Sequence, residues 1–78
     1  MKNATIITTL GVFLGILDAR ANIEIFRIVD NSGKQELLRS TKVYNLLGDA
    51  EFLGKYGFYK VKGLSVCFGT VSILIEEA

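Results

Sequence analysis

The side chains that could do chemistry in this chain are few and dispersed. The chain has no histidine, one cysteine and eight acidic residues, so the most common general base and metal ligand of proteins is missing. Its only adjacent acidic pair, Glu76 and Glu77, stands near the C-terminal end. Acid–base catalysis and metal binding need side chains that converge, and no spacing here predicts such a cluster. We therefore expect no enzyme, no catalytic or metal-binding residues and no cofactor.

Three local patterns invite a chemical interpretation, and each has a simpler one. Cys67 lies in the apolar string Leu64–Phe68, which predicts a small buried side chain rather than a nucleophile. Gly11 and Gly15 do not form a phosphate-binding loop, because no Lys-Ser or Lys-Thr pair follows them. The segment Asp30–Lys34, with the sequence DNSGK, is typical of a hairpin turn, although such a turn can also hold an ion.

Length and composition indicate one small domain over residues 1–78. Half of the residues are hydrophobic, proline is absent, and nine basic and eight acidic groups leave a net charge of +1. A core of this size gives little net stability, and self-association often adds to it. The balanced charge argues against a protein that coats nucleic acid, because such proteins neutralise many phosphates.

An uncharged run from Asn3 to Leu17 can be interpreted in three ways. A secretory signal is one, but a single Lys2 precedes the run, and Asp18 and Arg20 crowd the expected cleavage site. A membrane-spanning helix is another, but about 20 apolar residues are needed to cross a bilayer. We therefore expect residues 1–21 to belong to the fold of a cytoplasmic protein without a membrane anchor. The β-branched residues at the start leave a strand open as an alternative to a helix there.

Hydrophobic periodicity and turn residues predict an α+β domain. Helical spacing is expected in the first segment, with Thr8 or Thr9 as its N-cap, and again after Ser40 or Thr41, with a break at Gly48-Asp49. Alternating and β-branched segments predict two hairpins. The predicted elements are a helix over Thr9–Arg20, strands over Asn22–Val29 and Gln35–Ser40, helices ending near Leu47 and Lys55, and strands over Phe58–Phe68 and Val71–Glu76. The order α-β-β-α-β-β predicts a four-stranded, mainly antiparallel sheet with helices on one face.

The same pattern resembles small uncharacterised proteins encoded in prophages and conjugative elements of Firmicutes. The resemblance covers about residues 9–76 and rests on five short segments: Thr9-Leu10, Ile23-Glu24-Ile25 before a turn with Gly33, Leu46-Leu47, Tyr59-Lys60-Val61 and Val71-Ser72-Ile73-Leu74-Ile75. It implies an accessory protein of a mobile element, with no catalytic residues to transfer. The chain departs from those proteins in its first helix, where apolar residues and glycines replace the usual charged positions.

That first helix supplies one candidate interface. Two glycines at i and i+4 predict a smooth groove on a helix face that is otherwise apolar. Burying this face against a second chain would remove several hundred Å² of apolar surface from water, at roughly 25 cal/mol for each Å². The face could equally be covered inside its own fold. The candidate interface consists of Leu10, Gly11, Val12, Gly15 and Ile16.

A second candidate surface combines lysines with aromatic residues. Such a mixture can follow a phosphate backbone and stack bases. In a strand, however, Lys60 and Lys62 share one face and Tyr59 the other, which favours a solvated strand face that protects a sheet edge. The residues of this candidate nucleic-acid site are Lys55, Tyr56, Tyr59, Lys60 and Lys62.

Together these features predict a non-enzymatic protein-interaction module of a phage or mobile element, forming a homodimer through its first helix. Its most specific form is an inhibitor of a host defence protein, and the partner's identity does not follow from the residues. One alternative is a small nucleic-acid-binding protein that uses the segment Lys55–Lys62. Another is a self-associating structural protein, and a weaker one is a membrane-associated peptide that uses Ile6–Leu17.

Overall fold

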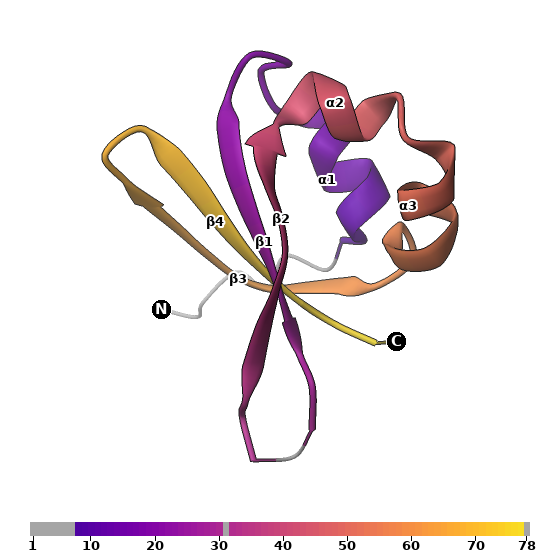
Figure 1. The fold of residues 1–78 in the computed structure, drawn as a ribbon, viewed down its shortest axis with the longest axis vertical. Helices are drawn as coiled ribbons and strands as arrows, with labels where there is room; N and C mark the ends of the chain where they lie inside the picture. The colour runs from indigo at the N-terminus through magenta and orange to yellow at the C-terminus, as the bar shows by residue number, and fades with distance from the viewer. Residues whose placement is uncertain (1–7, 31, 78) are drawn as a thin grey trace, which may run out of the picture.

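The computed structural model describes residues 8–30 and 32–77. These residues form a small α+β domain with three helices and four strands (Figure 1). The strand alternative for the residues before Thr8 lies outside the described part of the chain. In chain order the elements are α1 (Leu10–Ile16), β1 (Asn22–Ile28), β2 (Gln35–Lys42), α2 (Val43–Leu47), α3 (Ala50–Tyr56), β3 (Lys60–Cys67) and β4 (Thr70–Glu76).

The four strands form one mixed sheet in the order β2-β1-β4-β3. The outer pairs are the two predicted antiparallel hairpins, β1–β2 and β3–β4, so the prediction of a mainly antiparallel sheet is confirmed. The central strands β1 and β4 are parallel, which the sequence analysis did not predict. Each outer strand carries a bulge: Leu38 is the extra residue of β2 and Lys62 the extra residue of β3.

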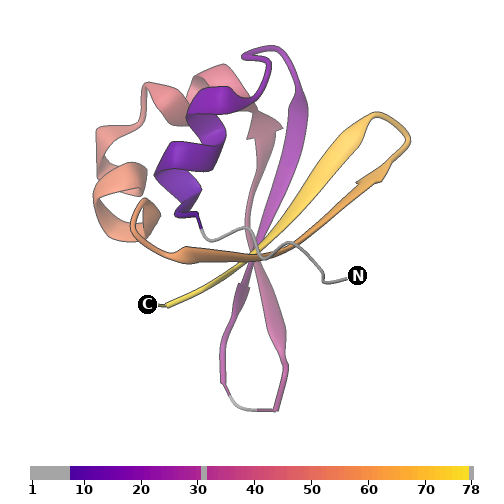
Figure 2. The same cartoon turned by 180° about the vertical axis from the view of Figure 1, so that it is seen from behind.

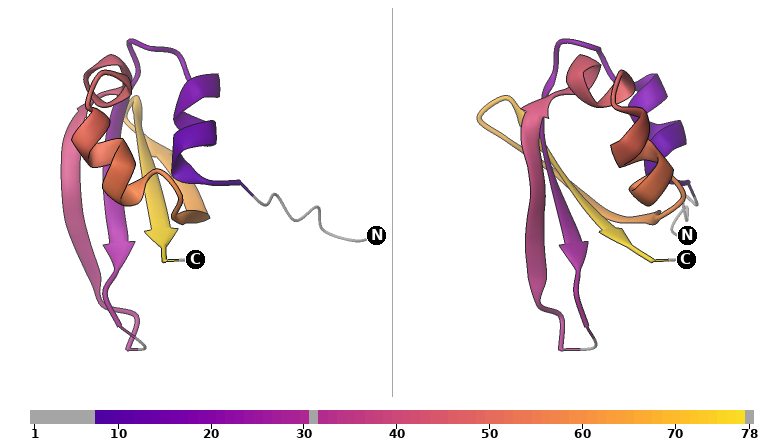
Figure 3. Two further views of the ribbon diagram at one scale, coloured as in Figure 1. Left: turned by 90° about the vertical axis from the view of Figure 1, so that its right-hand side faces the viewer. Right: turned by 45° about the vertical axis from the view of Figure 1, so that its right-hand side comes forward.

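All three helices lie on the same side of the sheet, as predicted (Figure 3). Alternate residues of β1 and β4 point toward them and are almost completely buried, as the period-2 pattern requires. The opposite side is called here the open face, and no helix of the described residues lies over it (Figure 3). The core consists of Leu10, Leu14, Ile23, Ile25, Val43, Leu46, Phe52, Tyr56, Ile73 and Ile75.

Helix α1 is shorter than predicted. Thr9 caps it as expected, because its hydroxyl accepts a hydrogen bond from the backbone N–H of Val12. The helix ends at Ile16 rather than Arg20. Asp18 explains the difference: its carboxylate accepts the N–H of Arg20 at 2.8 Å, so the side chain stabilises a turn in competition with the helix.

The segment between the hairpins folds as two short helices, with the predicted break at Gly48-Asp49. The Asp49 side chain caps α3 by accepting the N–H of Phe52 at 3.0 Å. The predicted hydroxyl cap of α2 is wrong: its N-cap is Lys42, without a side-chain hydrogen bond. Backbone carbonyls of the loop after α1 accept the first N–H groups of α2 instead, so tertiary contacts replace the local cap.

The helices cover only part of the sheet. The far end of the β3–β4 hairpin extends beyond the helical layer, as two opposite views show (Figures 1 and 2). The other end of β3 is joined to the start of α1 by an isolated bridge between Thr9 and Lys60. One hairpin thus has a covered end and an uncovered end.

Candidate interaction surfaces

The uncovered end of the β3–β4 hairpin exposes three large apolar side chains. Leu64 is 50% exposed, Val66 72% and Phe68 101%. No charged residue occurs from Gly63 to Ile75, so no charge accompanies this apolar surface. The three residues are called here the hairpin end. Contiguous apolar surface without charge is typical of protein-interaction sites.

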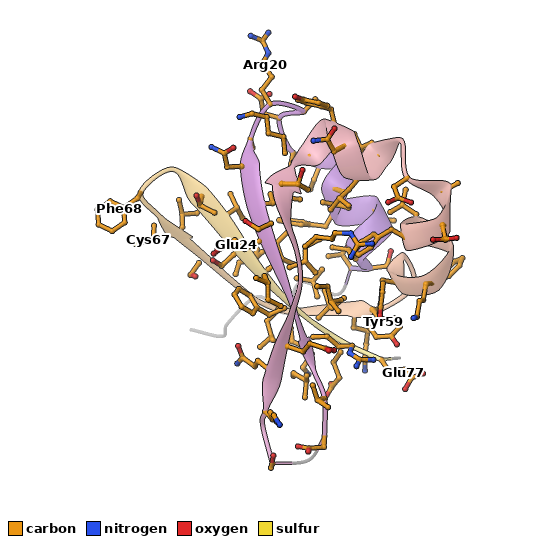
Figure 4. All side chains as sticks on the ribbon, viewed as in Figure 1. Arg20, Glu24, Tyr59, Cys67, Phe68 and Glu77 are labelled. Atoms are coloured by element: carbon orange, nitrogen blue, oxygen red, sulfur yellow. The ribbon has the colours of Figure 1, made fainter. Side chains whose placement is uncertain are left out.

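Phe68 occupies an unusual backbone conformation at the turn. Its φ is +51° and that of Gly69 is +78°, and positive values at both central residues are typical of a type I′ hairpin turn. Asn, Asp or Gly normally fills the first of these positions, because a side chain with a Cβ is strained there. Phe68 therefore keeps an aromatic ring at a position that disfavours it. The ring projects from the turn, away from the rest of the molecule (Figure 4).

Cys67 is exposed beside Phe68 (Figure 4), so the prediction of a buried thiol is wrong. Its neighbours form an apolar string that normally indicates a core strand. Here the strand runs past the three helices, which do not cover it at this point (Figures 1 and 2). Exposure at this point depends on tertiary arrangement, which the local sequence does not determine.

A shallow hollow of about 390 Å³ lies beside the hairpin end. On the open face, Leu37, Phe26 and Leu74 form an apolar row across β2, β1 and β4. The row ends at Gly63 of β3, which lies opposite Leu74 and has no side chain to fill the space. The hollow is lined by Phe26, Gln35, Gly63, Leu64, Ser65, Ser72, Ile73 and Leu74. A partner's side chain could enter it.

The predicted interface on the first helix is only partly exposed. Leu10 lies in the core at 0% exposure. Gly11 packs against the turn after α3, where its N–H donates to the carbonyl of Gly57 at 2.9 Å. Val12, Gly15 and Ile16 remain on the outer face, with 63% of Val12 and 74% of Ile16 exposed. The groove that the two glycines predict is therefore half filled.

The lysine–tyrosine segment is divided between core and surface. Tyr56 is buried, and Tyr59 is partly buried with its ring edge against Tyr56 at a centroid distance of 5.1 Å. Lys55 lies over the Tyr56 ring at 5.3 Å, and Lys62 forms an ion pair with Glu76 at 3.6 Å. Lys55 and Lys60 are both exposed residues. The two tyrosine rings pack against each other rather than lying open for bases to stack on.

Two charged groups of the β1–β2 hairpin have shifted pKa values. Ser32 donates hydrogen bonds to the carboxylate of Asp30 from both its hydroxyl and its N–H, which lowers the pKa of Asp30 below the ordinary 3.8. Arg27 donates to Glu36 at 2.7 Å, and this contact, followed by one with Tyr59, raises the pKa of Arg27. Both groups lie in the β1–β2 hairpin, and of the candidate surfaces only the lysine–tyrosine segment is contacted, by Arg27 at Tyr59.

Within residues 8–30 and 32–77, no helix is long and apolar enough to cross a membrane. In the same part of the chain, no group of three acidic or cysteine side chains lies close enough to hold a metal ion. Comparison with known proteins finds no matching family model, no similar curated protein and no similar solved structure. The surfaces described above are therefore the basis for any functional assignment.

Proposed function

We propose that this chain is a non-enzymatic protein-interaction module that binds its partner through the hairpin end. The observation that carries the proposal is Phe68, fully exposed in a left-handed conformation at the tip of a hairpin without charge from Gly63 to Ile75. Backbone strain persists where something else selects for it, and binding sites are a common place for it. A projecting aromatic ring supplies a large contact area that a partner's pocket can bury.

The proposal favours the hairpin end over the outer face of α1. Val12 and Ile16 are exposed, but they lie on a regular helix with no strained residue, and single exposed apolar residues are normal on protein surfaces. The hairpin end combines exposed apolar side chains, absence of charge and backbone strain. Partner binding at this position would bury apolar surface on a stretch that carries no charged residue from Gly63 to Ile75.

The resemblance to prophage and conjugative-element proteins suggests the setting: a cytoplasmic accessory protein whose partner is a host protein. An inhibitor of a host defence protein is the most specific form of this proposal. A small domain can inhibit by occupying a site on its target without chemistry of its own. The proposed inhibitor needs no catalytic group and no cofactor.

A matched pair of variants tests the proposal. The chain is tagged at its C-terminus and used to capture proteins from a Firmicute lysate, at low and at high salt, alongside Phe68→Asn and Val12→Asn. We expect the parent and Val12→Asn to retain one stoichiometric protein at high salt, and Phe68→Asn to lose it. Equal capture by Phe68→Asn would contradict the assignment of the hairpin end. Captured nucleic acid that is released at high salt would support the lysine–tyrosine alternative instead.

A further inference from the structure

The two edges of the sheet differ in how they are protected. The β2 edge carries Glu36, Arg39 and Lys42 and is interrupted by the bulge at Leu38. Charges and bulges on an edge strand prevent it from pairing with another chain. Over residues 63–67, the β3 edge has no charged residue, no bulge and no proline. An uncharged, apolar edge of this kind is available for pairing.

The first part of the β3 edge is already occupied. The N–H of Val61 donates to the carbonyl of Thr8 at 3.0 Å, and the carbonyl of Tyr59 accepts from the N–H of Leu10 at 2.9 Å. These bonds cover the edge up to the bulge at Lys62. Among the described residues, no strand pairs with the edge beyond that point. Within residues 8–30 and 32–77, the unpaired stretch, called here the free stretch, therefore begins at Gly63.

The backbone groups that face outward on this stretch can be identified. Every second residue of β4 lies opposite one of three residues of β3, namely Val61, Leu64 and Val66. The strand β4 has no bulge over this range, so its alternation is unbroken. In an antiparallel pair, alternate residues direct both backbone groups away from the neighbouring strand. Since Val61 donates outward, the N–H and C=O groups of Leu64 and Val66 also point toward the free edge.

We infer that the free β3 edge pairs, antiparallel, with the same edge of a second copy of this chain, about a two-fold axis at Ser65. Leu64 then lies opposite Val66 of the second copy, and the two pairs exchange four backbone hydrogen bonds. Gly63 lies opposite Cys67, and Ser65 opposite its own counterpart. The sheet continues through the interface as eight strands, with the apolar side chains gathered on the helical side.

Three features favour a second copy over another extended chain. The free stretch is self-complementary about Ser65, with apolar residues opposite apolar ones and small residues opposite small ones. No like charges meet, because the stretch has none. The helices lie near the other end of β3, away from the free stretch (Figure 2). The interface is smaller than a standard one, so we expect a dissociation constant on the order of tens of micromolar.

This inference rests on the proposed interaction role: it assigns the backbone of Leu64 and Val66 to a second copy of the chain and leaves Phe68 as the residue of the hairpin end that contacts a different protein. The first test is molecular mass in solution, from about 10 µM to about 1 mM, for the parent and for two variants. Val66→Lys places a charge on the edge, and Val12→Lys places one on an equally exposed apolar site of α1. We expect Val66→Lys to weaken dimerisation roughly tenfold or more, and Val12→Lys to leave it unchanged.

A parent that stays monomeric throughout this range would overturn the inference. Loss of the dimer in Val12→Lys, but not in Val66→Lys, would overturn it in favour of the α1 face. A monomer whose Leu64 and Val66 amides resist hydrogen exchange would also overturn it, because these groups would then be paired within the chain itself. The capture experiment with Phe68→Asn does not depend on the outcome of the dimer experiment. Failure of the dimer and failure of the proposed function can therefore be distinguished.

A disulfide tests the register directly. Residues directly opposite each other in a pair that shares no hydrogen bonds have Cα atoms about 4.5 Å apart, within the range that a disulfide spans. In a Cys67→Ser background, Ser65→Cys should therefore form a covalent dimer under mild oxidation. Ser40→Cys, on the β2 edge, is the matched control and should not. Equal crosslinking of the two variants would contradict the Ser65-centred register.

Discussion

Replacing Phe68 by asparagine should make the protein more stable while removing its proposed binding residue. Phe68 is fully exposed, so its substitution loses no burial within the folded chain. An L-residue in the left-handed region costs roughly 1–2 kcal/mol, and asparagine reduces this cost because it tolerates that region. We therefore expect the free energy of unfolding to rise by about 1 kcal/mol.

Thermal unfolding followed by circular dichroism measures this change. For a domain of this size, 1 kcal/mol corresponds to a rise in Tm of roughly 4–8 °C. The protein should be held at low micromolar concentration, so that self-association does not contribute. Phe68→Ala is the matched control: it removes the ring but keeps a Cβ in the left-handed conformation, so its stability should stay close to that of the parent.

A loss of stability in Phe68→Asn would refute the reasoning. It would mean that the ring packs against other residues of the same chain in solution, so that it is not free to bind a partner. If Phe68→Ala gained as much stability as Phe68→Asn, the destabilising effect of Phe68 would come from its exposed ring rather than from its backbone conformation. The predicted combination is a more stable protein that no longer binds, a trade-off common at functional sites.

Four further substitutions test the fold, each by urea or thermal unfolding. Gly15→Ala should stabilise by roughly 0.5–1 kcal/mol, because a Cβ at this exposed helical position meets nothing within 4 Å; a loss would show that the α1 face is covered. Gly57→Ala should destabilise, because its Cβ would lie 2.4 Å from the carbonyl oxygen of Leu53; unchanged stability would contradict the close approach there. Asp49→Ala should cost about 1 kcal/mol through loss of the α3 cap, and an unchanged Tm would contradict the cap. Because folding lowers the pKa of Asp30, its carboxylate contributes fully to the free energy of unfolding above pH 3.8, and this contribution is lost as the pH falls through the lower pKa of the folded state. Asp30→Asn should flatten this acid dependence of stability, and an unaltered pH profile would contradict the contribution of Asp30.

The sequence predicts the secondary structure well because local signals agree with the fold. Alternating residues in β4, the DNSGK turn and the break at Gly48-Asp49 each place an element within a few residues of its observed bounds. The parallel pairing of β1 with β4 leaves no local signal, because it joins segments almost fifty residues apart. The early end of α1 follows from the Asp18 turn, which helical periodicity alone does not reveal.

The candidate surfaces were harder to predict than the elements. Leu10 and Val12 both follow the apolar pattern of the first helix, yet one is buried and the other exposed, because burial depends on where α2 and α3 pack. Leu64 and Val66 have the residue types of a core strand, and only the limited extent of the helical layer leaves them uncovered. One signal was available: Phe68 precedes Gly69 at a two-residue turn, where Asn or Asp is expected.

A photo-crosslinking residue placed on each surface in turn tests the central claim most directly. We would substitute p-benzoylphenylalanine at Phe68, at Ile16 and at Lys60, irradiate Firmicute cells that express each variant, and identify the adducts by mass spectrometry. Binding through the hairpin end predicts a protein adduct from position 68 and none from position 16. An adduct only from position 16, or a nucleic-acid adduct from position 60, would contradict the claim.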